Sequence, residues 1–172
     1  MLVDFNTLPD TSRIWIYQAN RSLTPEELAE IKADLDKFIV DWTAHGSELI
    51  AGYEIKYKRF IALALDQTNA SAGSAAPLYL ILDLVVYSID ASVRFIQGLE
   101  KKYNINLLDK MNVSYKQGEF VAYKTLVDFK KMAKNKSVTK NTIVFNNLVA
   151  NKQEYLNHWE VPAEESWHGR FM

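Results

Sequence analysis

The sequence has no cysteine among its 172 residues. This absence excludes disulfide bonds, thiolate zinc sites and a cysteine nucleophile, and it fits the reducing cytoplasm, where we expect the protein. The first ten residues lack the basic start and apolar run of a signal peptide. The most apolar stretch, residues 77–87, is interrupted by Asp83 and is about half as long as the ~20 residues that cross a bilayer. We therefore expect a soluble protein with no membrane span.

Glycine is also scarce, and the nucleotide-binding motifs that depend on it are missing. None of the six glycines precedes a lysine, so there is no phosphate-binding P-loop, and no Gly-x-Gly-x-x-Gly fingerprint occurs. A His-Glu-x-x-His zinc motif is absent, and the three histidines lie on separate segments. The sequence therefore predicts neither a metal nor a cofactor.

Charge of one sign is not in large excess, but it is unevenly distributed. The net charge is −1, with 7 basic and 11 acidic side chains in residues 1–70 against 13 and 10 in residues 71–172. The basic excess comes from one run, which comprises Lys130, Lys131, Lys134, Lys136 and Lys140. Proteins that bind single-stranded nucleic acid combine basic residues with aromatic ones, and no aromatic residue is interleaved with these lysines. We interpret the run as a solvated helix end and loop, and we predict no nucleic-acid partner.

What the sequence does contain is typical of one globular domain. About half of the residues are apolar and about a quarter are charged. Thr24 and Glu27 form a capping-box pattern before an apolar face that repeats at three- and four-residue steps, which predicts a helix over 25–44. The tail, 161–172, holds two large aromatic residues and is expected to dock on the body.

The remaining elements are predicted from alternation, turn residues and apolar periodicity. Together they predict a single α+β domain over 1–172, with a mainly antiparallel sheet packed by two or three helices. These elements are a strand at 13–18, one bent or two separate strands within 50–66, a loop at 67–76, a helix at 88–103, a hairpin of 111–115 and 120–123 with Gly118 in its turn, a short helix at 126–132, and an apolar patch followed by a helix within 142–159.

Two patterns indicate places where a site could lie. Each histidine lies within three residues of a tryptophan, and tryptophan often lines pockets, although it is more often a core residue. Arg94 lies between Val93 and Phe95, which suggests partial burial, and Asp90 is four residues before it. The Asp90–Arg94 pair is either an ordinary surface pair or part of an anion site that Asp66 borders.

Six segments of the chain resemble a family of short, uncharacterised bacterial proteins commonly labelled "ABC transporter ATPase". They are 12–18, 42–46, 59–61, 88–95, 144–149 and 161–168, so the resemblance extends along nearly the whole chain. The label implies nucleotide hydrolysis, but the sequence has no Walker A loop and no Leu-Ser-Gly-Gly-Gln signature, so ATPase activity is not predicted. The family has a short Ala-Ser-Gly-Cys segment where this chain has residues 72–87, which we interpret as an apolar insertion without the cysteine. This insertion is buried, paired as a strand, or fused to the next helix; its apolar spacing favours one helix over 77–103.

Three hypotheses of function follow, and the first is favoured. In the first, the chain is a non-catalytic domain that binds a small anionic ligand or a protein partner. In the second, it is a hydrolase that uses His45 or His168 as a base, within hydrogen-bond reach of a carboxylate or of a serine such as Ser166. In the third, it is a scaffold that forms oligomers through 77–87. The candidate ligand-binding residues are Asp66, Asp90 and Arg94, with an aromatic and basic wall of Trp42, His45, Trp167, His168 and Arg170.

Overall fold

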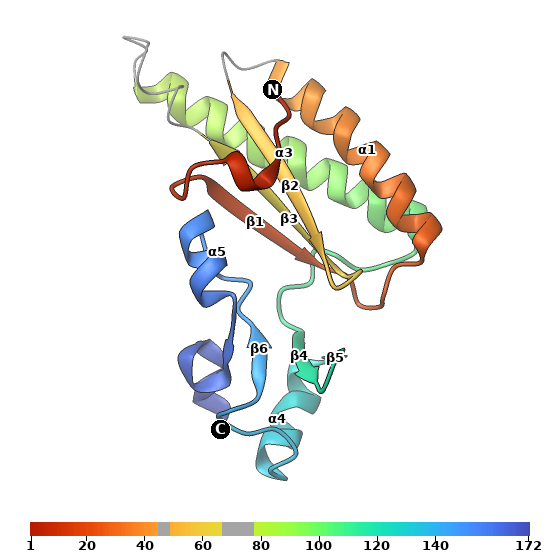
Figure 1. Ribbon diagram of the computed structural model, residues 1–172, viewed down its shortest axis with the longest axis vertical. Helices are drawn as coiled ribbons and strands as arrows, with labels where there is room; N and C mark the ends of the chain where they lie inside the picture. The colour runs from red at the N-terminus through yellow and green to blue at the C-terminus, as the bar shows by residue number, and fades with distance from the viewer. Residues whose placement is uncertain (45–48, 67–77) are drawn as a thin grey trace.

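The computed structural model describes residues 1–44, 49–66 and 78–172, without the side chains of residues 44 and 78–88. Within these ranges the chain forms seven strands, four α-helices and three short 3-10 helices (Figure 1). The predicted α+β class with antiparallel sheets is confirmed. The elements are η1 (Phe5–Thr7), β1 (Arg13–Gln18), α1 (Pro25–Ala44), β2 (Ile50–Lys56), β3 (Phe60–Asp66), α3 (Leu78–Tyr103), β4 (Val113–Gln117), β5 (Phe120–Lys124), α4 (Leu126–Lys134), β6 (Ile143–Phe145), α5 (Lys152–His158), β7 (Glu160–Pro162), η2 (Ala163–Glu165) and η3 (Trp167–Phe171).

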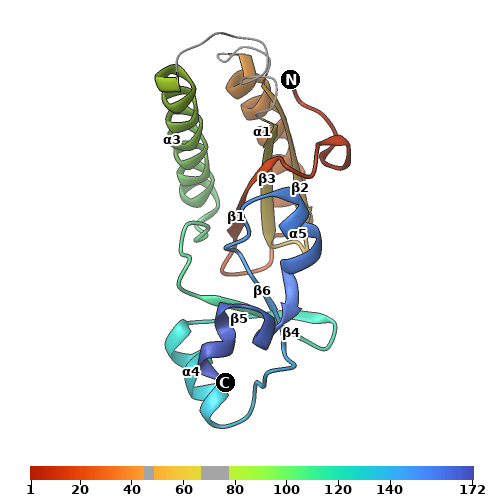
Figure 2. The same cartoon turned by 90° about the vertical axis from the view of Figure 1, so that its left-hand side faces the viewer.

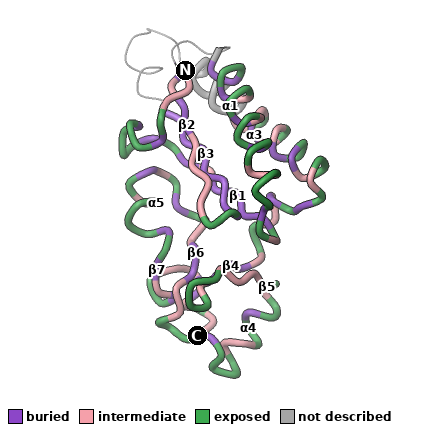
Figure 3. The backbone as a smooth tube through the Cα atoms, turned by 45° about the vertical axis from the view of Figure 1, so that its right-hand side comes forward, coloured by how far each residue is buried: buried purple, intermediate pink, exposed green. Residues whose placement is uncertain are grey.

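The first sheet has three antiparallel strands in the order β1-β3-β2. Its central strand, β3, is an almost continuous apolar run, and all seven of its residues are buried (Figure 3). This burial follows from the strand's two covered faces. Helices α1 and α3 lie on one face, and η1 and α5 lie on the other (Figures 1 and 2).

The two long helices, α1 and α3, form where the apolar periodicity of the sequence predicts them. On the predicted apolar face of α1, Ile31, Leu35 and Ile39 are fully buried against the sheet, and Leu28 and Phe38 pack partly buried against the same core. Helix α3 runs unbroken from Leu78 to Tyr103, as the favoured alternative of one helix over 77–103 predicts, and it contributes buried Ile96 and Leu99 to the same core. The predicted loop at 67–76 lies outside the described residues.

The second sheet has four antiparallel strands in the order β5-β4-β6-β7. Strands β4 and β5 form the predicted hairpin, and Gly118 in its turn has a φ of 62°, a left-handed conformation that glycine adopts without strain. Helix α4 and the C-terminal tail pack on this sheet, where Trp167 and Met172 contact a buried cluster around Phe129. The predicted docking of the tail is therefore confirmed.

The two sheets share a core rather than standing apart. The outer face of the first sheet contributes Phe60, which packs against Phe145 of β6 and Trp159 beside α5, with ring centroids 4.6 Å and 5.0 Å away. The division into two sheets, where one mainly antiparallel sheet was expected, arises because β4 pairs with β6 through the single register Tyr115↔Val144 and not with any strand of the first sheet.

Among the described residues, no helix combines the length and apolar character that crossing a bilayer requires. The cytoplasmic location stays a prediction. So does the oligomer interface at 77–87, because the side chains of that segment lie outside the described part of the structure.

Candidate functional site

The residues singled out in the sequence do not gather in one place. Trp42 is a core residue of α1: its ring stacks on Phe38 at 5.2 Å and meets Trp15 edge-on at 6.1 Å. It lies near the C-terminal end of α1, at the opposite end of the molecule from the C-terminal tail (Figure 1). His45 lies outside the described residues. The predicted wall joining Trp42 to Trp167 is therefore not assembled in this structure.

The residues of the predicted anion site around α3 do not form one site. Asp66 is buried at the end of β3, whereas Asp90 and Arg94 are exposed on α3. The expected partial burial of Arg94 is wrong, because the ring of its neighbour Phe95 turns inward to stack on Phe38 and leaves the arginine on the outer face. No ion pair joins Asp90 to Arg94, although both side chains are described.

The C-terminal tail does bring predicted residues together, at a cleft of ≈380 Å³. Four segments contribute to this C-terminal cleft: the loop before β4, helix α4, the loop after β6, and η3. Its lining consists of Lys110, Met111, Leu126, Lys130, Leu148, Trp167, Arg170 and Phe171.

The tail lines the C-terminal cleft with η3, which is held in place by a side-chain cap and by packing against neighbouring rings. Ser166 accepts a hydrogen bond from the backbone N–H of His168 at 3.3 Å, which starts η3. His168 is buried beneath Trp167, with ring centroids 3.9 Å apart, and it meets Phe129 edge-on. The buried histidine thus supports the face of Trp167 from below.

Two of the cations around the cleft are held over aromatic rings. The Arg170 Nε donates to the carbonyl of Trp167 at 3.0 Å, and its guanidinium lies 5.3 Å from the Trp167 ring and 5.4 Å from Phe171. From α4, the Lys130 ammonium lies 4.6 Å from the Phe171 ring. Such cation–π contacts orient a charged group while leaving its remaining N–H donors available.

The charge and apolarity of the cleft define what it can hold. Of the described residues that line the cleft, three are cationic, none is acidic, and the other five are apolar or aromatic. Met111 and Leu148 are each 64% exposed, so the apolar lining is open to solvent. A volume near 380 Å³ lies at the small end of the usual range for ligand sites.

The serine–histidine pair that the hydrolase hypothesis requires is present but is built as a cap. The Ser166 Oγ lies 2.7 Å from the His168 Nδ1 and 3.2 Å from the carbonyl oxygen of Ala163. Neither Ser166 nor His168 lines the C-terminal cleft, and burial, with a smaller contribution from nearby Arg170, lowers the pKa of His168 to about 4. This geometry serves the start of η3, so we do not build a reaction on it.

Comparison with protein-family models, with curated proteins and with solved structures returns no match in any of the three cases. Among the described residues, no three histidine or carboxylate side chains are grouped to hold a metal ion.

Part of this cleft was visible in the sequence and part was not. The sequence predicts Trp167 and Arg170 as site residues, and Phe171 is the second of the two large aromatic residues in the tail. All five lysines of the basic run are exposed, as predicted, and Lys130 in addition lies over the Phe171 ring. Met111 and Leu148 carry no local signal, since only their unusual exposure in the fold distinguishes them.

Proposed function

We propose that this protein binds an organic anion with an apolar body in the C-terminal cleft. The apolar or aromatic part of the ligand lies on Trp167 and Phe171, and its carboxylate or phosphate faces Arg170 and Lys130. This proposal is a narrower form of the predicted small anionic ligand.

The observation that carries the proposal is the combination of an apolar lining with three cations and no carboxylate. Each Å² of apolar surface that the ligand and the cleft bury together contributes about 25 cal/mol to binding, whatever the charge of the ligand. The basic side chains make the cleft prefer a negatively charged ligand, because they attract an anion and repel a cation. Since the described residues of the lining include no hydroxyl, thiol, imidazole or carboxylate side chain, the arrangement supports binding rather than catalysis.

The test uses three probes of one shape and different charge: decanoate, decanol and decyltrimethylammonium. We expect decanoate to bind most tightly, decanol more weakly and the cation least, measured by titration calorimetry at low salt. Tryptophan fluorescence should respond to decanoate in the native protein and lose that response in Trp167→Phe. Equal affinity for decanoate and decanol would contradict the proposal, because the basic groups would then contribute nothing.

Charge variants locate the anionic end of the ligand. Arg170→Gln and Lys130→Gln are each expected to raise the Kd for decanoate about three- to tenfold, since each removes one partly solvated charge contact. The matched control is Lys101→Gln, which removes an exposed lysine from the last turn of α3 and should leave the Kd unchanged. An equal loss in the control would show a general charge effect rather than a site.

A further inference from the structure

Among the described residues, the N-terminal segment covers one end of the outer edge of β2 and nothing pairs with the other end. The N-terminal residues pair with it in parallel: the N–H of Val3 donates to the carbonyl of Ala51 at 2.9 Å, and the N–H of Ala51 donates to the carbonyl of Met1 at 3.0 Å. Both backbone groups of Ala51 therefore point away from β3. After Val3 the chain leaves the edge, because Asp4 caps η1 by accepting from the N–H of Asn6 at 2.7 Å.

Within the part of the chain that the structure describes, the rest of this edge is unpaired. The register of β2 with β3 is continuous from Ile50 to Lys56, so backbone groups alternate strictly in direction. Tyr53 and Ile55 therefore point outward, as Ala51 does. In the described ranges, no strand pairs with β2 on that side at these residues, and no backbone hydrogen bond reaches them there. Unpaired edges of this kind are templates for an added strand.

A groove of ≈590 Å³ follows this free edge between α1 and the N-terminal segment, and its charge is mainly negative. Three carboxylates and one lysine, Lys32, line it. Glu54 is engaged by the Tyr155 hydroxyl at 2.9 Å and by Lys56 at 3.4 Å. Of the other two carboxylates, Asp4 accepts from the N–H of Asn6 and Asp36 accepts from the Tyr53 hydroxyl at 2.8 Å. Neither forms an ion pair among the described residues.

We infer that this edge binds an extended segment of a partner protein that carries lysine or arginine side chains. The segment continues the strand position that Met1–Val3 occupy and pairs its backbone with the outward groups of Tyr53 and Ile55. Its basic side chains face Asp4 and Asp36. A second copy of this chain is a poorer occupant, because pairing two β2 edges places the carboxylates of one groove against those of the other.

The experiment uses a fluorescein-labelled peptide, Lys-Val-Lys-Val-Lys-Val, in an anisotropy titration of the full chain at low salt. Two further forms of the peptide carry N-methyl groups on the backbone, one form at the lysines and the other at the valines. Each form therefore lacks the N–H donors that point to one side of the extended peptide but keeps its charge, so the pair separates strand pairing from charge attraction. We expect one form to bind at least about tenfold more weakly and the other to bind like the parent, because only one set faces β2. The counterpart with glutamate in place of lysine should not bind. Equal binding by the two methylated forms would overturn strand addition.

Charge variants of the protein complete the test. Asp4→Asn and Asp36→Asn keep a capping or accepting oxygen and are each expected to weaken binding about two- to fivefold. Glu119→Gln, in the exposed β4–β5 turn, is the matched control and should change nothing. Full binding by the Asp4→Asn, Asp36→Asn double variant would overturn the assignment to this groove. So would sedimentation showing a dimer that the lysine peptide does not dissociate, because the edge would then hold a second copy.

Discussion

At the scale of the residue, His168 couples the structure to pH. The side chain is 1% exposed between Trp167 and Phe129, and burial lowers its pKa from 6.5 to about 4. Between these two values the unfolded chain binds a proton that the folded chain does not, so acid favours unfolding. We expect the free energy of unfolding to be fully retained above pH 6.5 and to fall by up to about 3 kcal/mol as the pH drops to 4. Urea denaturation across this range measures it.

Two histidine variants separate this effect from general acid denaturation. His168→Gln removes the buried imidazole, and we expect the pH dependence of stability between 6.5 and 4 to become flatter. His158→Gln removes an exposed imidazole at the end of α5 and should leave the slope unchanged. A histidine NMR titration giving an ordinary pKa for His168 would contradict the prediction.

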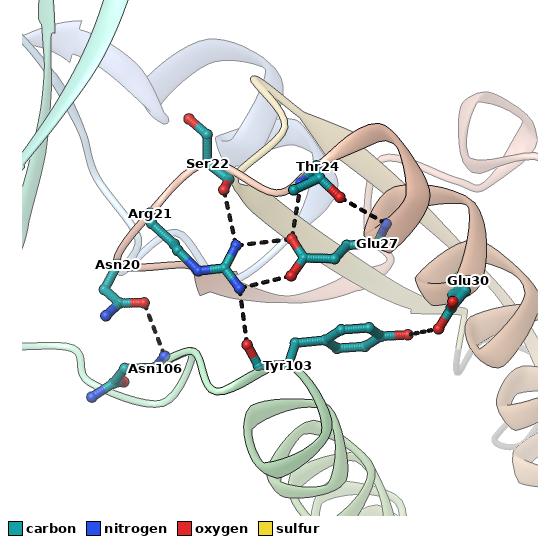
Figure 4. A network of polar contacts seen from close by, with 8 residues as sticks. All are labelled: Asn20, Arg21, Ser22, Thr24, Glu27, Glu30, Tyr103 and Asn106. Carbon is teal, nitrogen blue, oxygen red and sulfur yellow. Dashed lines mark hydrogen bonds and ion pairs between the residues drawn. The ribbon is translucent and has the colours of Figure 1, made fainter.

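At the scale of the element, the start of α1 shows what local sequence determines and what it does not. The capping box formed as predicted: the Glu27 N–H donates to the Thr24 Oγ1 at 3.2 Å, and the Thr24 N–H donates to the Glu27 Oε2 at 2.9 Å. Arg21 adds a bidentate pair to Glu27 at 2.8 and 2.7 Å and donates to the carbonyl of Tyr103 at 2.9 Å (Figure 4). Through Arg21, the beginning of α1 is tied to the end of α3.

The Arg21–Glu27 pair is therefore expected to stabilise the packing of these two helices. The guanidinium of Arg21 and the N–H of Thr24 hold the pKa of Glu27 at about 2. A double-mutant cycle with Arg21→Gln and Glu27→Gln should give a coupling of about 0.5–1 kcal/mol, because the pair is bidentate although near the surface. Glu26→Gln serves as the control, since Glu26 lies in the same turn without bonding Arg21. A cycle with zero coupling would show that the pair contributes nothing beyond the cap.

The difference between contacts that are local in sequence and contacts between distant residues explains how much of the fold and of the site could be predicted. The helices, the hairpin and the buried strand β3 were predicted because their patterns repeat within a few residues. Their division between two sheets was not, because it depends on pairs far apart in sequence, such as Tyr115 with Val144. The C-terminal cleft was predicted only where it lies in the tail, since Lys110 and Leu148 reach it from separate loops. The edge groove has no sequence signal, because a free edge is defined by the absence of a neighbour.

At the scale of the whole molecule, the turn between β2 and β3 lies where the two sheets meet. The Tyr57 hydroxyl donates to Glu160 at 2.5 Å, and Lys116 of the second sheet bonds the same carboxylate. Two residues later, the buried Arg59 donates to the carbonyl of Ala19 at 3.0 Å and, more weakly, to that of Val121 in β5 at 3.4 Å. One short turn therefore contacts both sheets.

This turn has left-handed backbone at two residues that are not glycine, with φ of 55° at Tyr57 and 50° at Lys58. A left-handed conformation costs a side-chain-bearing residue about 1–2 kcal/mol, and Asn-Gly is the usual sequence here. Lys58 is exposed, so we expect Lys58→Gly to relieve strain and raise the free energy of unfolding by up to about 1 kcal/mol.

Tyr57→Gly removes the same strain at the adjacent position and should nevertheless have the opposite effect. Besides its bond to Glu160, the Tyr57 ring packs edge-on against Phe145 with centroids 5.4 Å apart, so its loss is expected to lower the free energy of unfolding by about 1–2 kcal/mol. Urea denaturation of both variants measures the difference. If both glycine variants were more stable than the native chain, the strain at Tyr57 would outweigh its contacts with the second sheet. Opposite signs would show that the contacts of Tyr57 with Glu160 and Phe145 stabilise the fold by more than its backbone strain costs.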